Sequence, residues 1–158
     1  MLNILRAGLA ATIQDAGRYG WRQYGISPGG VLDHPAMFTA NVLVGNDPDS
    51  AVLEMVLGQF KAEFTRDGWF ALTGAGCHAE LDGQPVWTGW RTPVKRGQLL
   101  SLAMPQRGMR SYLAVQGGFD IPAMLGSAST DLKAKFGGFH GRALQDGDQL
   151  PLGKPTRT

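Results

Sequence analysis

The stretch that decides the fold is FKAEF, residues 60–64, followed closely by WFALTGAG, residues 69–76. In FKAEF, two phenylalanines and an alanine alternate with a lysine and a glutamate, which is the period of two typical of a half-buried β-strand. Turn sequences such as LDGQ, KRGQ and QDGD separate further short segments of the same kind: LNILRAG, HAEL, QPVW, QLLSLAM and RSYLAVQGG. This pattern predicts a mainly β protein, either a closed or nearly closed barrel or a sandwich.

One helix is predicted at about residues 34–44. Asp33 is a suitable N-cap, Pro35 fits the first helical turn, and Gly45 can end the helix. We interpret Asp33 as this cap rather than as a catalytic acid or base. A second short helix is predicted to begin near Pro122.

Length and composition indicate one domain over residues 1–153, with 154–158 as a tail or the start of a linker. The chain has 158 residues, 43% hydrophobic and 18% charged, which is enough to form a core. The net charge of +2 is spread along the chain, so we expect no nucleic acid or membrane partner, but a small molecule or a protein. The first residues do not resemble a signal peptide, and Cys77 is the single cysteine, so we expect a cytoplasmic protein.

Four segments combine glycines with polar residues, and the first of them has almost no apolar periodicity. Glycine is used where the backbone needs positive φ or approaches another group closely, so we expect these segments to converge on a polar site. They are TIQDAGRYGWRQYGISPGGVLD (12–33), LAVQGGFD (113–120), GSASTD (126–131) and KFGGFHGRALQDGDQL (135–150).

The side chains in and beside these segments are suited to binding an oxyanion. Arg18, Arg110 and Arg142 lie beside glycines, and Ser129 and Thr130 offer hydroxyl donors. The sequence contains no GxxxxGK[ST] phosphate loop, so any nucleotide site has another design or lies on a partner.

Several polar residues have two interpretations. Gln14, Asp15 and Arg18 either tie a tight turn together or face a ligand. Asn41 lies within the predicted helix and needs a polar contact. Glu54 interrupts the apolar run AVLEMVL, and its side chain either points outward by strand alternation or pairs with a buried arginine.

The remaining reactive side chains give weaker signals. The three histidines lack the spacing of a metal motif, and we expect no metal. We expect Cys77 to be a small buried hydrophobic residue rather than a nucleophile. Trp69, Trp87 and Trp90 are expected to cover the barrel or an interface between subunits.

The motifs together resemble the allophanate hydrolase subunit 2 family, also called the biotin-dependent carboxyltransferase family. The resemblance runs in order along nearly the whole chain. Within the family, GWFALTGAGC, VWTGWR and GMRSYLAV are most similar to the bacterial group formed by the C subunits of 5-oxoprolinase. The strings that carry the family resemblance are TIQDAGRYG, GISPGGVLD, ANVLVGN, LE at 53–54, ALTGAG, RSYLAVQGGFD, GSASTD and GGFHGRALQDGD.

The resemblance implies a cyclophilin-like β-barrel and a place in a multi-subunit enzyme. In the 5-oxoprolinase system, subunits A, B and C together open the lactam of 5-oxoproline to glutamate, using ATP bound in the assembled complex. The alternatives are carboxyl transfer of the allophanate hydrolase or urea carboxylase type, or a non-catalytic KipA-like regulatory module. Biotin is not expected on this chain, because it has no Met-Lys biotinylation motif.

Family members normally continue into a second barrel-like half, so the chain resembles the N-terminal half. We therefore expect the isolated chain to be inactive, and either to form a symmetric homodimer or to bind its missing half through an apolar patch. The segments expected to form this patch are GWFALTG, VWTGW and the Leu150 to Leu152 end. For lactam opening we assign two sets of candidate residues. The catalytic set is Gln14, Asp15, Arg18 and Arg142, and the substrate-binding set is Asn41, Arg110, Ser129 and Thr130.

Overall fold

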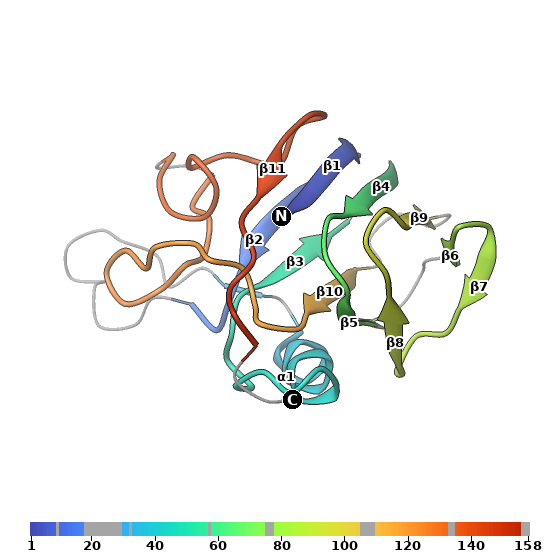
Figure 1. Ribbon diagram of the computed structural model, residues 1–158. Coiled ribbons are helices and arrows are strands. Elements are labelled where there is room, and N and C mark those ends of the chain that lie inside the picture. The colour runs from blue at the N-terminus through green and yellow to red at the C-terminus, as the bar shows by residue number, and fades with distance from the viewer. Residues whose placement is uncertain are drawn as a thin grey trace.

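The computed structural model describes residues 1–8, 10–17, 30–31, 33–56, 58–74, 78–104, 110–132 and 135–155. Within these ranges the chain forms two antiparallel sheets and one helix (Figure 1). The prediction of a mainly β protein is confirmed. Arg18 and Cys77, both singled out in the sequence, lie outside the described residues.

The first sheet has six strands, in the order β11-β1-β4-β9-β6-β7. Its strands are β11 (Gln149–Leu150), β1 (Leu2–Arg6), β4 (Gly58–Phe64), β9 (Leu99–Met104), β6 (His78–Leu81) and β7 (Gln84–Val86). The second sheet has five strands, in the order β2-β3-β10-β5-β8. Its strands are β2 (Ala11–Gln14), β3 (Val52–Met55), β10 (Ser111–Val115), β5 (Gly68–Gly74) and β8 (Arg91–Val94).

The main core lies between the two sheets, as the alternation in FKAEF predicts. Phe60, Ala62 and Phe64 of β4 are buried, whereas Lys61 between them is exposed. Phe64 stacks on Phe70 of β5, with ring centroids 5.3 Å apart, so one aromatic pair joins the six-stranded sheet to the five-stranded sheet. Burial of these apolar side chains between the sheets removes their surface from water, which stabilises the fold.

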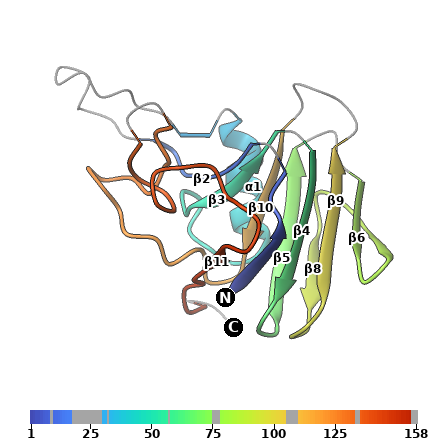
Figure 2. The same ribbon diagram turned by 90° about the horizontal axis from the view of Figure 1, so that it is seen from above.

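The helix α1 (His34–Leu43) packs on the other face of the five-stranded sheet, against β5 and β10 (Figure 2). The predicted caps are confirmed. The Asp33 side chain accepts a hydrogen bond from Ala36 N at 3.0 Å, Pro35 lies in the first turn, and Gly45 takes a positive φ of 79° after the helix.

The second helix predicted near Pro122 is wrong. Residues 121–123 belong to no helix or strand, and Met124 instead pairs with Ser127 through an isolated bridge. Leu125 and Gly126 have positive φ values of 54° and 83°, which a right-handed helix cannot accommodate. The chain therefore reverses direction before one helical turn could be completed.

The expected apolar patch is only partly present. Leu150 is fully buried, because β11 pairs with β1 and places it opposite Leu2, so its predicted exposure is wrong. Trp87 and Trp90, next to β7 and β8, are 72% and 69% exposed. These tryptophans are the part of the predicted patch that is open to solvent among the described residues.

The segment after β10 connects the edges of both sheets, on the β1 and β2 side of the molecule (Figure 1). On β2, Ile13 O accepts from Thr130 N at 2.9 Å and Ala11 O accepts from Leu144 N at 2.8 Å. On β1, Ile4 O accepts from Gly147 N at 2.7 Å. Because β2 is an edge strand, the bonds to it satisfy backbone groups that its sheet leaves free, and together with the bond to β1 they fix the polar loops of this segment in place.

The cap of α1 gives a direct test of the helix assignment. Replacing Asp33 by alanine removes the side-chain acceptor for Ala36 N, and we expect the free energy of unfolding to fall by about 1 kcal/mol in urea denaturation. Asp49→Ala, at an exposed position after the helix, is the matched control and should change stability by less than about 0.5 kcal/mol. Equal losses in the two variants would contradict the cap.

Candidate functional site

Asp15, directly after β2, is the centre of the predicted polar site. Its carboxylate accepts hydrogen bonds from Gly17 N at 2.9 Å, Ala128 N at 2.8 Å and Ser129 Oγ at 2.8 Å, and also from Ser127 Oγ. The Asp15 N–H in turn donates to Ser129 Oγ at 2.8 Å. We call Asp15, Ser127, Ala128 and Ser129 the Asp15 cluster. Here one carboxylate holds two distant parts of the chain together through charge-assisted hydrogen bonds.

Gln14 and Thr130 extend this cluster along β2. The Gln14 amide donates to Thr12 Oγ1 at 3.0 Å and to Thr130 O at 3.3 Å, and Thr130 Oγ1 donates to Ile13 O at 2.9 Å. The Gln14 side-chain oxygen is buried and accepts no hydrogen bond within the described part of the chain. Gln14, Asp15, Ser129 and Thr130 are thus brought together, as the sequence analysis expected of its Gly-rich segments.

Three of the four Gly-rich segments converge in their described portions. Gly138 N donates to Ala128 O at 3.0 Å, which brings residues 135–150 to the Asp15 cluster. A Cβ at Gly138 would collide with the Thr130 hydroxyl, so the close approach requires glycine. The segment 113–120 lies elsewhere, because its Gly117 packs against the carbonyl of Gly153.

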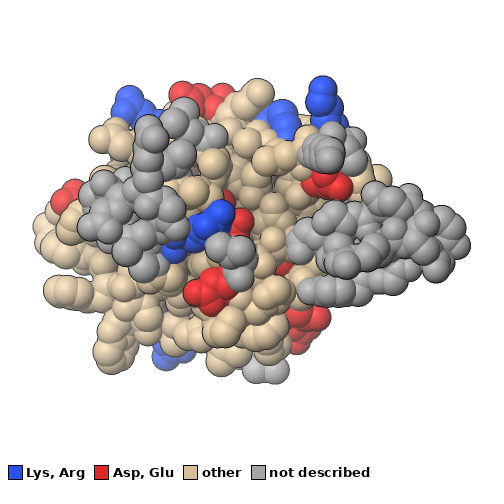
Figure 3. All heavy atoms as spheres, turned by 180° about the vertical axis from the view of Figure 1, so that it is seen from behind, with Lys and Arg blue, Asp and Glu red and all other residues tan. Residues whose placement is uncertain are grey.

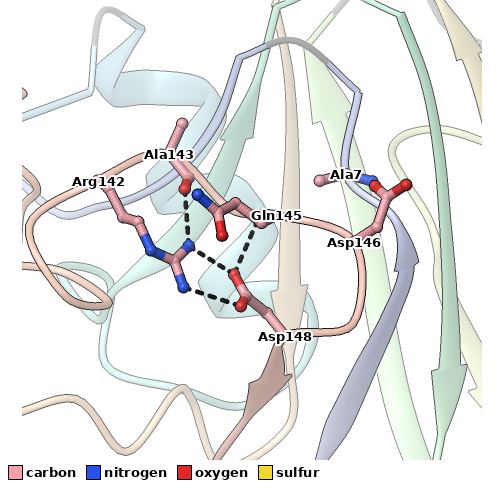
Figure 4. Close-up of polar contacts among 6 residues, drawn as sticks. All are labelled: Ala7, Arg142, Ala143, Gln145, Asp146 and Asp148. Carbon is pink, nitrogen blue, oxygen red and sulfur yellow. Dashed lines mark hydrogen bonds and ion pairs between the residues drawn. The ribbon is translucent and has the colours of Figure 1, made fainter.

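Arg142, on the same Gly-rich segment as Gly138, is held in an ion pair with Asp148 (Figure 4). Its two terminal nitrogens donate to the two oxygens of Asp148 at 2.8 and 2.9 Å, and Nη1 also donates to Ala143 O at 3.0 Å. This pairing lowers the pKa of Asp148 and raises that of Arg142. The Arg142 side chain is 32% exposed, and three of its five N–H groups donate to described residues, which leaves two donors without a partner in the described part of the chain.

Asn41 and Arg110 are not part of the Asp15 cluster. Asn41 is fully buried and donates to Pro48 O at 3.0 Å and Ser50 O at 2.8 Å, so the predicted polar contact is confirmed. These bonds hold the turn that follows α1 against the helix. Arg110 precedes β10, and its Nε is buried without a hydrogen-bond partner among the residues described.

A buried polar row was missed by the sequence analysis. It crosses the helix-covered face of the five-stranded sheet, where Glu54 is opposite both Thr12 and Tyr112. The Tyr112 hydroxyl donates to Glu54 Oε2 at 2.8 Å and accepts from Asp33 N at 3.0 Å. Burial, and then the Glu54 bond, raise the pKa of Tyr112. Thr73, opposite Tyr112, completes the row.

Of the two interpretations of Glu54, exposure to solvent is wrong, since this residue is only 9% exposed. The described residues show Tyr112 as its partner, and pairing with a buried arginine stays a prediction. The signal available in the sequence was the alternation in RSYLAV, which places Tyr112 on the same face of the sheet as Glu54.

The described residues contain no group of three or more His, Cys, Asp or Glu side chains placed to hold a metal ion. No helix within them is long and apolar enough to cross a membrane. On the face seen in Figure 3, basic and acidic residues are interspersed rather than gathered in one patch.

Comparison with known proteins identifies the family. Residues 24–158 match the family described as carboxyltransferase domain, subdomain A and B. The chain belongs to this carboxyltransferase-domain family. It is 61% identical over 157 residues to the C subunit of 5-oxoprolinase from Escherichia coli, covering 99% of this chain and 51% of that protein. It is thus a homologue of that subunit and spans about half its length.

Other members of the carboxyltransferase-domain family are more distant in sequence but keep the fold. The chain is 37% identical over 152 residues to urea amidolyase of Saccharomyces cerevisiae, covering 96% of this chain and 8% of that protein. The solved Kluyveromyces lactis urea carboxylase superposes with a TM-score of 0.93 at 35% identity, covering 98% of this chain and 14% of the other. The fold is therefore shared across members whose names differ.

A single substitution at the centre of the Asp15 cluster is expected to have a large effect on the free energy of unfolding. Asp15→Asn keeps the shape but replaces one acceptor oxygen with an amide donor, leaving at least one part-buried N–H or hydroxyl donor unpaired. We expect the free energy of unfolding to fall by about 2 kcal/mol in urea denaturation. Asp120→Asn, at an exposed side chain, removes the same charge and should be nearly neutral. A loss no greater than in the control would show that the cluster does not stabilise the fold.

The ion pair of Arg142 predicts a pH dependence. Since the pKa of Asp148 is lowered in the folded state, its stabilising contribution is present above the ordinary carboxyl pKa of about 3.9 and is lost as pH falls through the lowered value. Asp148→Asn should therefore cost about 2 kcal/mol at pH 7 and progressively less towards about pH 2.

Chemical denaturation across this pH range measures the difference between this variant and the unmodified chain. Asp49→Asn, at an exposed side chain, is the control variant measured alongside it. A deficit in Asp148→Asn that stays constant with pH would contradict the assignment.

Proposed function

We propose that the chain forms part of the C subunit of an ATP-dependent 5-oxoprolinase, which opens the lactam of 5-oxoproline to glutamate together with subunits A and B. The observation that carries this proposal is the 61% identity to the Escherichia coli C subunit along 99% of the chain. We further propose a cytoplasmic location, in keeping with a single cysteine among the 158 residues.

The chemistry of the reaction indicates what this chain could contribute. A lactam is stabilised by amide resonance, and ATP supplies the chemistry that turns its carbonyl oxygen into a leaving group. Positive side chains and N–H donors then stabilise the negative charge that develops. We propose that Arg18, Arg142 and Arg110 supply such charge, while Ser129 and Thr130 belong to the substrate-binding region. Asn41 is left out of this region, because it is fully buried and holds the turn after α1. The ATP site itself is not assigned to this chain.

Gln14 and Asp15 receive a positioning role in this proposal. The Asp15 carboxylate is already occupied by hydrogen bonds from the Gly-rich loop, so it is better placed to hold that loop than to transfer a proton. Gln14 ties Thr130 to β2. Arg142 has unused donors on a partly exposed guanidinium, which favours it as the residue that contacts an anion.

We also propose that the two sheets form a cyclophilin-like barrel, with residues 1–153 as one domain. The support is the segment after β10, which donates to Ile13 and Ala11 of β2 and to Ile4 of β1. These bonds join an edge strand of the five-stranded sheet to β1 of the six-stranded sheet.

A second candidate is carboxyl transfer of the urea carboxylase type. It is favoured by the TM-score of 0.93 with Kluyveromyces lactis urea carboxylase and by the 37% identity to Saccharomyces cerevisiae urea amidolyase. This activity would require a biotin carrier on another chain or domain.

A chimaera distinguishes the two functions. The matching half of the Escherichia coli 5-oxoprolinase C subunit is replaced by this chain, and the product is purified with subunits A and B. We expect 5-oxoproline-dependent ATP hydrolysis with glutamate formation. A chimaera that folds and joins the complex, but forms no more glutamate than a control containing only subunits A and B, would contradict the proposed function. Bicarbonate-dependent carboxylation with an added biotin carrier would instead support the second candidate.

Two variants of this chimaera test Arg142. Arg142→Ala should lower the rate of glutamate formation about a hundredfold, because a charge-assisted contact to a developing anion is lost. Asp148→Asn leaves the guanidinium in place, so it should lower stability while keeping the rate within about threefold. If both variants lose activity in step with stability, Arg142 supports the fold and does not contact the substrate.

A further inference from the structure

The outer face of the six-stranded sheet carries an open trough of about 550 Å³, on strands separate from those of the Asp15 cluster. Four strands, β1, β4, β9 and β6, lie side by side beneath it (Figure 2). Helix α1 packs on the other sheet, against β5 and β10, and does not cover this face. The lining residues used below are Leu5, Arg6, Lys61, Glu80, Ser101 and Ala103.

The shape of the trough follows from the sequence of its strands. Along β9, the outward positions are Ser101 and Ala103, while Leu102 between them is almost fully buried. Ser101 is opposite Lys61 of β4 on one side and Glu80 of β6 on the other. A floor of small side chains therefore runs along β9 between two walls of longer ones.

The wall on the β1 and β4 side forms a cationic ridge, made of Leu5, Arg6 and Lys61. Arg6 is directly opposite Lys61 in the strand register, and like charges in this position repel each other. Arg6 Nη1 donates to Gln59 Oε1 at 2.8 Å, which orients the guanidinium without neutralising it. Leu5, beside Arg6, is 47% exposed. Within the described ranges neither cation forms an ion pair with a carboxylate, so the ridge is suited to a carboxylate from another molecule.

The wall on the β6 side carries the opposite charge. Glu80 is two strands away from Lys61, which corresponds to roughly 10 Å between backbones. Glu80 is exposed, and it forms no ion pair among the described residues. In the described part of the chain, this face thus has unpaired cations on one side of β9 and an unpaired carboxylate on the other.

We propose that this face is the interface of a symmetric homodimer, in which a second copy of the chain packs on it sheet against sheet. A two-fold axis parallel to β9 turns the second copy over and exchanges its two sides. The cationic ridge of each copy then meets Glu80 of the other copy. Each contact occurs twice, as in every two-fold interface.

Charge complementarity carries this proposal. A face with cations on one side and a carboxylate on the other is complementary to itself after the two-fold rotation, whereas a face of one sign would repel its copy. An ion pair in open water contributes little, but the second sheet shields these pairs from solvent and also covers Leu5. The floor of Ser101 and Ala103 leaves room for the long side chains of the other copy's ridge.

This interface differs from the apolar patch expected from the sequence. The exposed Trp87 and Trp90 lie next to β7 and β8 and are not part of the trough lining. The proposal does not rest on the proposed function, because it concerns association of this chain with itself.

Light scattering on the purified 158-residue chain tests the dimer. We expect a molar mass near twice 16.9 kDa at high micromolar concentration. Lys61→Glu and Glu80→Lys each turn both attractive contacts of the dimer into repulsive ones, so each should raise the dissociation constant at least about tenfold. Both side chains are exposed, so circular dichroism should show an unchanged fold. Lys95→Glu, at an exposed position between β8 and β9, is the matched control and should dimerise as the unmodified chain does.

Mixing the two variants tests the pairing itself. In a mixed pair, the two carboxylates of a Lys61→Glu copy face the two ammonium groups of a Glu80→Lys copy, so both contacts are attractive again. We therefore expect a one-to-one heterodimer from the mixture, at concentrations where each variant alone is monomeric.

The proposal is overturned if the unmodified chain is monomeric, if both variants dimerise as tightly as it does, or if their mixture associates no better than either variant. Loss of the dimer in Trp87→Gln, with Lys61→Glu unaffected, would also overturn it by placing the interface at the exposed tryptophans. These measurements need neither ATP nor subunits A and B. Their failure is therefore distinguishable from failure of the chimaera to form glutamate, which would contradict only the proposed function.

Discussion

The hydrogen bonds from residues 127–129 to the carboxylate of Asp15 are the interaction on which the polar side of this molecule depends. Asp15 follows β2, which ends one side of the five-stranded sheet and would otherwise leave its backbone groups unpaired. The carboxylate accepts from two hydroxyls and from the backbone of Ala128, which holds the distant segment against that edge. Because these bonds are charge-assisted and part-buried, losing the acceptor leaves several donors unsatisfied at once.

The position of the Gly-rich loops follows from this interaction. Thr130 pairs with Ile13, Gly138 reaches Ala128, and Leu144 pairs with Ala11 further along β2. The same segment continues to the ion pair of Arg142 with Asp148 and then to β11. A charged loop placed in this way offers donors close to solvent on a rigid base, which is the arrangement that stabilisation of an anion requires.

Local patterns in the sequence predicted the elements that depend on local forces. The alternation in FKAEF predicted β4 with its buried face, and Asp33, Pro35 and Gly45 predicted both ends of α1. Such features are determined by strand geometry and by helix capping, which act over a few residues. The convergence of Asp15 with Ser129 was predicted only as a meeting of Gly-rich segments, because a contact across more than a hundred residues has no local signal.

The remaining features depend on tertiary packing. Strand alternation alone allows Glu54 to point into solvent, but α1 covers that face and Tyr112 supplies its hydrogen bond. Leu150 was expected at an exposed end, but pairing with β1 buries it. The helix predicted at Pro122 failed because Leu125 and Gly126 reverse the chain. For Glu54 and Leu150, the decisive partner lies far away in sequence. For the segment after Pro122, the decisive factor is a backbone conformation that composition does not specify.

Amide hydrogen exchange in Asp15→Asn, followed residue by residue by NMR, tests the central claim most directly. If Asp15 holds the whole segment, protection of the Ala128, Thr130 and Leu144 amides should fall together, by at least about tenfold more than that of the amides between β5 and β10, which lose only the protection due to the lower global stability. If Ala128 alone loses protection and Thr130 and Leu144 exchange as before, the segment is held by other contacts and the account is contradicted.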